Sequence, residues 1–83
     1  LSLPAVAVAS TRVRDERVED GVFTFRTRGP KGTVAKMQVL VPDTPRQVET
    51  VPPLPLEQRY NRVKGALYIS FENIAEDVEV RIR

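Results

Sequence analysis

The chain has 83 residues with neither cysteine nor histidine, and its 13 Lys and Arg residues exceed its 11 Asp and Glu residues by a net charge of +2. A chain of this length builds one hydrophobic core, so we expect a single domain over residues 1–83. Without Cys or His it lacks disulfides, thiolate nucleophiles, Ser-His pairs and the commonest zinc ligands. We therefore predict a protein that is not an enzyme and that holds no metal or cofactor.

Charged residues of opposite sign are interleaved along the chain. Arg12, Arg14 and Arg17, for example, are interrupted by Asp15 and Glu16. A nucleic-acid-binding protein instead gathers its cations on one face, because each neutralised phosphate adds to the affinity. The pattern predicts a solvated, self-compensating surface and no nucleic-acid partner. Because no apolar run is long enough to span a bilayer, we expect no membrane partner either.

The residue types favour strands over helices. The chain has 13 Val, 6 Thr and 3 Ile, which together make 22 of 83 residues, and β-branched side chains suit a pleated sheet. Seven Pro and four Gly divide the chain at short intervals, and no stretch of helical length carries an apolar stripe. We predict an all-β fold, a small antiparallel, immunoglobulin-like β-sandwich of six or seven strands, with a small β-barrel as the alternative.

The first predicted strand is the apolar run at residues 4–9. Residues 7–10, Ala-Val-Ala-Ser, also resemble the small-residue cleavage site of a signal peptide. The chain opens with a leucine and no basic segment precedes the run, so we prefer the strand.

A hairpin is predicted between residues 11 and 28. The dipeptide Asp20-Gly21 is typical of a type I′ turn, and a two-residue loop there sets Val18 opposite Phe23. Continuing the same register would place Glu16 opposite the inward-facing Phe25. We therefore expect a bulge, or an early end of the first strand, at this point.

The next strand follows a loop at residues 29–32, and every second residue from Ala35 to Val41 is apolar. A five-residue connection would return this strand alongside the previous one. Phe25 would then meet Ala35 and Phe23 would meet Met37, so that both apolar faces coincide. We predict a second hairpin in this register.

Prolines shape the middle of the chain. Pro42 and Pro45 end the preceding strand because they lack the N–H that a sheet ladder needs, and a short segment follows at residues 46–51. Residues 52–55, Pro-Pro-Leu-Pro, resemble ligands of WW domains, but a rigid crossing between two sheets explains them without a partner. Residues 56–64 lack a clean period, and we predict irregular chain or a weak strand.

Two alternating segments complete the chain. Leu67, Ile69 and Phe71 form one apolar face, and Val78, Val80 and Ile82 form another. We predict that these strands form a terminal hairpin. On its outer face this hairpin would place Tyr68 opposite Arg81.

The second half of the chain resembles a known type of domain. The second half has a strand ending in proline (residues 39–42), a short valine-containing strand (residues 47–51) and two final strands (residues 65–71 and 78–82). This order is similar to that of the small C-terminal β-sandwich domains of glycoside hydrolases. The resemblance covers about the last 50 residues and implies a non-catalytic accessory module. Such a module would pack against a catalytic partner and stabilise it.

Candidate sites are few. The paired carboxylates at residues 15–16, 19–20 and 76–77 could in principle act as a glycosidase acid and base, but their polar, Arg-rich surroundings predict ordinary surface charge. A sugar-binding surface usually presents an aromatic platform, and Tyr60 and Tyr68 are the aromatic residues not expected in the core. The candidate interaction surface consists of Tyr60, Ala66, Tyr68 and Arg81. We predict contact with a neighbouring domain of a larger polypeptide or with an identical copy, and carbohydrate or small-ligand binding is the alternative.

Overall fold

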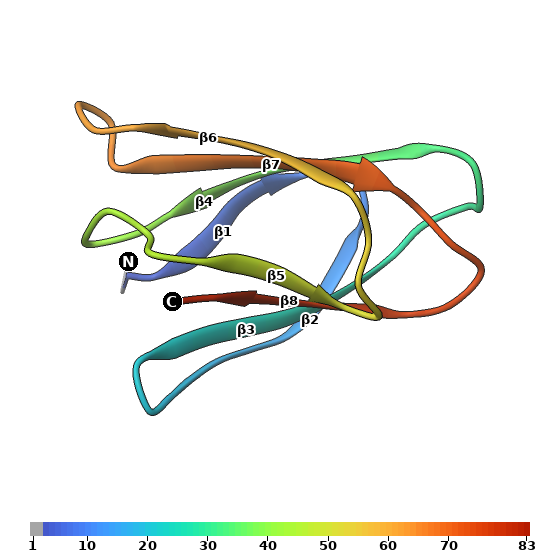
Figure 1. The fold of residues 1–83 in the computed structure, drawn as a ribbon, viewed down its shortest axis with the longest axis horizontal. Coiled ribbons are helices and arrows are strands. Elements are labelled where there is room, and N and C mark those ends of the chain that lie inside the picture. The colour runs from blue at the N-terminus through green and yellow to red at the C-terminus, as the bar shows by residue number, and fades with distance from the viewer. Residues whose placement is uncertain (1–2) are drawn as a thin grey trace.

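The computed structural model describes residues 3–83 and shows eight strands packed as two sheets (Figure 1). The strands are β1 (Ala5–Ala9), β2 (Arg12–Glu19), β3 (Val22–Arg28), β4 (Val34–Leu40), β5 (Val48–Val51), β6 (Leu56–Asn61), β7 (Ala66–Glu72) and β8 (Val78–Ile82). One sheet has the order β1-β4-β7-β6 and the other β2-β3-β8-β5, and every pairing is antiparallel. The prediction of an all-β sandwich is confirmed. No helix among residues 3–83 is long and apolar enough to cross a membrane.

The strand count and the strand order differ from the prediction. The structure has eight strands rather than six or seven, because both the short segment at residues 46–51 and the uncertain stretch at residues 56–64 contain one. In an immunoglobulin constant domain the first two strands are neighbours in one sheet. Here β1 and β2 belong to different sheets. The immunoglobulin-like subtype is therefore not confirmed by the strand order.

The predicted hairpin between β3 and β4 is wrong. β3 pairs with β2 and β8, whereas β4 pairs with β1 and β7. Phe25 lies opposite Val80, and Ala35 lies opposite Phe71. The connection after Arg28 does not turn back within one sheet but crosses to the other. Phe25 and Ala35 consequently belong to the two facing sheets and share only the core between them.

The predicted terminal hairpin is wrong for the same reason. β7 pairs with β4 and β6, and β8 pairs with β3 and β5, so the connection between them also crosses the sandwich. Tyr68 lies opposite Gln38 and Arg59, not opposite Arg81. Arg81 instead faces Thr24 and Glu49 on the other sheet.

The assignment of side chains to inner and outer faces is correct along β3, β4, β7 and β8. Phe25, Ala35, Val39 and Val80 are completely buried, and the rings of Phe23 and Phe25 lie 5.5 Å apart, centroid to centroid. The core cluster comprises Phe23, Phe25, Ala35, Met37, Val39, Val41, Leu67, Ile69, Phe71, Val78, Val80 and Ile82. Alternation of apolar residues therefore identified which side chains face inward, although it did not identify which strands pair.

The first hairpin and its bulge are confirmed. Val18 pairs with Phe23 across the Asp20-Gly21 turn, and the register shifts between Arg14 and Arg17. Glu16 lies within the bulge, where its carboxylate accepts a hydrogen bond of 3.0 Å from the backbone N–H of Val6 in β1. The bulge thus turns a charged side chain away from the core and uses it to link the edges of the two sheets.

A buried asparagine joins the two crossings at one end of the sandwich. The N–H of Asn73 donates to the carbonyl of Thr33 (2.8 Å), and its side-chain amide donates to Thr33 Oγ1 (3.0 Å). The N–H of Gly32 in turn donates to the carbonyl of Asn73 (3.1 Å). These bonds hold the β3–β4 and β7–β8 connections together.

Residues 52–55 form the predicted rigid crossing, here from β5 to β6. Thr50 is buried and organises this crossing, because its hydroxyl donates to the carbonyl of Pro52 and accepts from the N–H of Leu54, both at 2.9 Å. The Leu54 side chain packs against the core. The leucine of the Pro-Pro-Leu-Pro segment is therefore part of the folded domain.

Candidate functional site

The structure separates the four residues of the predicted interaction surface. Tyr68 lies on the outer face of β7, but Arg81 lies on the outer face of β8, on the opposite side of the sandwich. Ala66 is completely buried, and Tyr60 packs against the core. The four residues do not form one surface, because their grouping depended on the incorrect β7–β8 pairing. Tyr68 and Arg81 each lie on an outer face, but on opposite sides of the sandwich.

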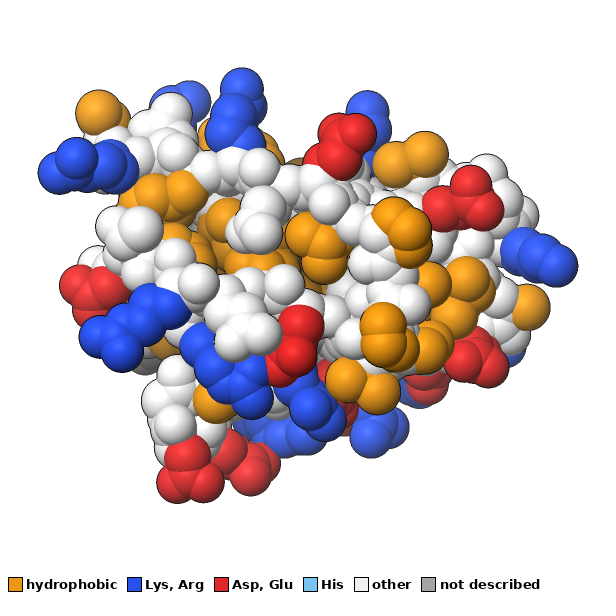
Figure 2. All heavy atoms as spheres, in the orientation of Figure 1, with side chains coloured by type: hydrophobic (Ala, Val, Ile, Leu, Met, Phe, Trp, Pro, Cys, Tyr) orange, Lys and Arg blue, Asp and Glu red, His pale blue; other side chains and the backbone are white. Residues whose placement is uncertain are grey.

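Ion pairs cover the outer face of the β2-β3-β8-β5 sheet. All seven ion pairs found within residues 3–83 join residues of this sheet or residues directly flanking β8. Glu79 contacts Arg81 (2.6 Å) and Arg17 (3.5 Å), and Asp77 contacts Arg14 and Arg28. In Figure 2, blue and red side chains are intermixed over the lower half of the molecule, where this sheet lies. Most cations of this face are thus matched by neighbouring anions, and Arg12 is the exception, with no ion pair among residues 3–83.

Glu79 is held in its charged form at the centre of these ion pairs. A hydrogen bond from Arg81 is the main cause that lowers the pKa of Glu79 below its ordinary value, and the charges of Arg81, Arg17 and Arg26 lower it further, against an opposing effect of burial. A general acid that works near neutral pH needs a raised pKa. The lowered pKa of Glu79 is the opposite of what a general acid needs.

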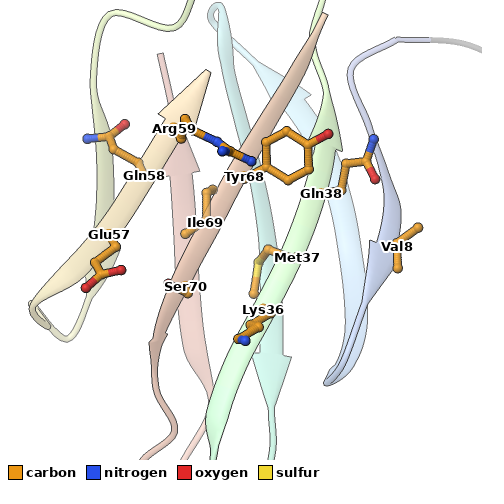
Figure 3. Close-up of a pocket in the computed structure, with 10 residues that line it drawn as sticks. All are labelled: Val8, Lys36, Met37, Gln38, Glu57, Gln58, Arg59, Tyr68, Ile69 and Ser70. Atoms are coloured by element: carbon orange, nitrogen blue, oxygen red, sulfur yellow. The ribbon is translucent and has the colours of Figure 1, made fainter. Parts of the chain in front are cut away.

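A shallow hollow opens on the outer face of the other sheet, and all four strands of that sheet line it (Figure 3). We call it the Tyr68 hollow. Its volume is about 590 Å³, and its side chains include Val8, Lys36, Gln38, Glu57, Arg59 and Tyr68. The hollow combines an aromatic ring, apolar side chains, both signs of charge and amide groups. Such a set can bind a partner by contact and hydrogen bonding.

Arg59 and Tyr68 form the most specific contact in the Tyr68 hollow. They are direct cross-strand neighbours on β6 and β7, and the guanidinium carbon of Arg59 lies 5.0 Å from the centre of the Tyr68 ring. This distance is that of a cation–π interaction. Figure 3 shows the Arg59 side chain extending toward the ring from β6. The interaction fixes Tyr68 at the surface and occupies part of its aromatic ring.

The lining of the Tyr68 hollow contains neither histidine nor cysteine. Ser70 supplies an aliphatic hydroxyl to the lining beside its cross-strand partner Lys36, and the chain has no histidine that could activate it. Within residues 3–83, no three His, Cys, Asp or Glu residues are grouped so that they could hold a metal ion.

A second hollow lies at the end of the sandwich near the β2–β3 turn. Its volume is about 890 Å³, and it is walled largely by loop residues, including those at 42–46, together with Asp20 and Arg83. No pattern in the sequence predicts this second hollow. Its walls come mainly from turns, whereas strands form the base of the Tyr68 hollow.

Sequence reasoning placed Tyr68 at the surface but missed its neighbours. The alternation of β4 already implies that Lys36 and Gln38 point outward, on the face opposite Met37. That Arg59 of β6 would lie beside Tyr68 depends on a strand that the sequence left uncertain. Comparison of the chain with protein-family models, curated proteins and solved structures finds no match in any of the three.

Proposed function

We propose that this chain is a non-catalytic accessory module that contacts a partner through the outer face of its β1-β4-β7-β6 sheet. A marked difference between the two outer faces carries this proposal. The β2-β3-β8-β5 face is covered by ion pairs, whereas the other face presents the Tyr68 hollow and two exposed valines, Val8 in the lining and Val34 on β4, whose exposed fractions are 62% and 55%. The centres of protein interfaces are enriched in aromatic residues and depleted of charge.

The proposed partner is a neighbouring domain of a larger polypeptide or an identical copy of the chain. The resemblance of the second half to accessory domains of glycoside hydrolases makes a catalytic domain the neighbour to test first. Sandwich domains are often called immunoglobulin-like even where their strand order differs, and we propose this relation only in that broad architectural sense. Fold alone does not determine function, so the proposal depends on the exposed face.

Two observations support the proposal that the chain is non-catalytic and does not bind nucleic acid. The chain contains neither cysteine nor histidine, which removes the usual nucleophile–base pairs. Most arginines of the β2-β3-β8-β5 face contact carboxylates, as Arg17 does with Glu19 (2.9 Å) and with Glu79 (3.5 Å). Cations neutralised in this way have little capacity to release counterions from a nucleic acid.

Binding of a carbohydrate or another small ligand is the second candidate function. The volume of the Tyr68 hollow lies in the usual range for ligand sites, about 300 to 1,000 Å³, and Lys36, Gln38 and Glu57 supply hydrogen-bonding groups around the ring. Sugar binding by stacking needs a free aromatic face. Arg59 already lies over the Tyr68 ring, and this favours the accessory role.

Titration of the isotopically labelled chain with a panel of glycans, followed by NMR, separates the two functions. An accessory module should show no shifts of the Tyr68 and Gln38 amides up to about 1 mM glycan, a concentration at which even weak binding is detected. Tyr68→Ala serves as the control variant, since it removes the ring without touching the core. Saturable shifts that disappear in Tyr68→Ala would favour the ligand-binding function instead.

A further inference from the structure

The sandwich has four edge strands, β1 and β2 on one side and β5 and β6 on the other. Both β1 and β2 have irregularities that hinder pairing with another chain. An edge strand presents unpaired N–H and C=O groups, and bulges are a common way to protect it. β1 has a register shift between Val6 and Val8, and Glu16 caps the N–H of Val6. β2 has its own shift after Arg14. A further strand cannot add regularly to either edge.

The other side of the sandwich has one protected edge and one open edge. β5 is only four residues long, and Pro52 and Pro53 follow it directly. β6 is six residues long, contains no proline and pairs with β7 without any shift of register. Three consecutive residues of β6, Glu57, Gln58 and Arg59, are exposed. Figure 1 shows β6 as the outermost strand of its sheet.

The direction of the backbone groups along β6 follows from a hydrogen bond two strands away. The N–H of Val41 donates to the carbonyl of Gly65 (3.0 Å), so Gly65 directs its carbonyl toward the β4 side of β7. Successive residues of a strand direct their backbone N–H and C=O groups alternately to the neighbouring strands on either side. Because Gly65 is directed to β4, Ala66 and Tyr68 form their backbone hydrogen bonds with β6. Their partners there, Asn61 and Arg59, bond back toward β7. The N–H and C=O groups that point away from the sheet therefore belong to Leu56, Gln58 and Tyr60.

The sequence of β6 is complementary to itself in one antiparallel register. When two copies are centred on Gln58, each Glu57 faces Arg59 of the other copy, and each Leu56 faces Tyr60. The outward-directed backbone groups of Leu56, Gln58 and Tyr60 then meet one another, as an antiparallel ladder requires. Registers centred on Glu57 or on Arg59 would instead place like charges directly opposite each other, which is destabilising.

We propose that two copies of this chain pair through β6 in the register centred on Gln58. This inference goes beyond the proposed function, because it places an identical copy at the β6 edge rather than on the outer face of the sheet. The two β1-β4-β7-β6 sheets become one continuous antiparallel sheet. A two-fold axis perpendicular to the sheet keeps both Tyr68 hollows on the same side. Each Arg59 then lies between Tyr68 of its own copy and Glu57 of the other.

Sedimentation measurements over a range of concentrations test this pairing with charge-reversal variants. The wild-type chain should approach twice its monomer mass of 9.3 kDa as its concentration rises. Glu57→Arg and Arg59→Glu should each weaken dimerisation by about tenfold or more, because each places two pairs of like charges opposite each other. The double variant Glu57→Arg/Arg59→Glu should restore it. Arg12→Glu, a charge reversal at an exposed residue of β2 in the other sheet, should leave the dimer intact.

A proline variant tests the backbone contacts separately from the charges. Gln58→Pro removes an N–H that points away from β7, so the fold should survive while the dimer is lost. Circular dichroism and thermal melting establish that each variant is folded, and Glu57→Arg keeps the Arg59–Tyr68 contact in case Arg59→Glu does not fold.

Two results would overturn the β6 pairing. One is a wild-type chain that stays monomeric up to about 1 mM. The other is a dimer that tolerates Glu57→Arg and Gln58→Pro, because it must then form through another surface. Neither result bears on the proposal that the outer face of the β1-β4-β7-β6 sheet contacts a partner. Photo-crosslinking from Val8 and Val34 tests that proposal independently. Conversely, a β6 dimer with no crosslinks from Val8 or Val34 would uphold this inference and contradict the proposed contact face.

Discussion

The side chain of Asn73 lies so close to Gly29 that a Cβ at residue 29 would come within 2.6 Å of the Asn73 amide nitrogen. Asn73 is buried and bonded to Thr33, so it has little freedom to move aside. Gly29→Ala should therefore lower the free energy of unfolding by about 1–3 kcal/mol, the usual cost of overpacking. Urea denaturation of both proteins measures the difference.

The double variant Gly29→Ala/Asn73→Ser is the matched control for this clash. A serine at residue 73 leaves room for the added methyl group, so the effect of Gly29→Ala should be smaller in the Asn73→Ser background than in the wild type. Equal effects in both backgrounds would show that contact with Asn73 is not the cause.

Glu16 should protect one edge of the sandwich. Glu16→Ala leaves the N–H of Val6 without its 3.0 Å acceptor, and the amide hydrogen of Val6 should exchange several times faster with solvent. Since the bond is exposed, the free energy of unfolding should fall by no more than about 1 kcal/mol. NMR-detected hydrogen exchange measures this, with Glu76→Ala as the control at another exposed carboxylate. Unchanged exchange at Val6 would contradict the capping role.

The ionised carboxylate of Glu79 should make the fold sensitive to acid. The pKa of Glu79 is lower in the folded chain than its ordinary value of 4.5, chiefly through its hydrogen bond with Arg81. A lowered pKa in the folded state contributes stability that is fully present above the unfolded pKa and is lost as pH falls through the folded pKa. The free energy of unfolding should therefore decrease below about pH 4.5.

Glu79→Gln tests whether Glu79 causes part of this acid sensitivity. The variant should be less stable than the wild type near neutral pH, and the difference should shrink as pH falls from about 5 toward about 3. Urea denaturation across this range gives the comparison. A difference that stays constant with pH would rule out ionisation of Glu79 as its source.

The cation–π contact of Arg59 with Tyr68 should contribute a measurable coupling energy. A double-mutant cycle with Arg59→Ala and Tyr68→Leu should give about 0.5–1 kcal/mol, as expected at an exposed site. Tyr68→Phe keeps the ring and should retain most of the coupling. If Tyr68→Phe loses the coupling as fully as Tyr68→Leu does, the hydroxyl rather than the ring face is responsible.

Local patterns predicted much of this fold. The alternation of Ala35, Met37 and Val39 assigned the core face of β4, and the conflict between Glu16 and Phe25 correctly predicted the bulge. Both inferences depend only on the period-two direction of side chains in a strand. In residues 52–55, the fixed φ angles of the prolines restrict the backbone to an extended conformation, and this was sufficient to predict a crossing between the sheets.

Strand pairing could not be predicted in the same way. A connection of five residues, such as residues 29–33, can turn back within one sheet or cross about 10 Å to the facing sheet, and in both cases Phe25 and Ala35 become buried. The contacts of Asn73 favour the crossing, and they involve residues 40 positions apart. The candidate surface was predicted incorrectly for this reason, since the position of Arg81 relative to Tyr68 depends on pairing alone.

The most direct test of the proposed contact face is site-specific photo-crosslinking in the native host. A photoreactive amino acid is placed at Val8 or Val34 on the β1-β4-β7-β6 face, and at Arg12 or Arg26 on the opposite face, and mass spectrometry identifies the crosslinked peptides. Crosslinks to one neighbouring domain or to a second copy should arise from Val8 and Val34 and be absent from Arg12 and Arg26. Crosslinks that arise from Arg12 and Arg26 instead would contradict the account.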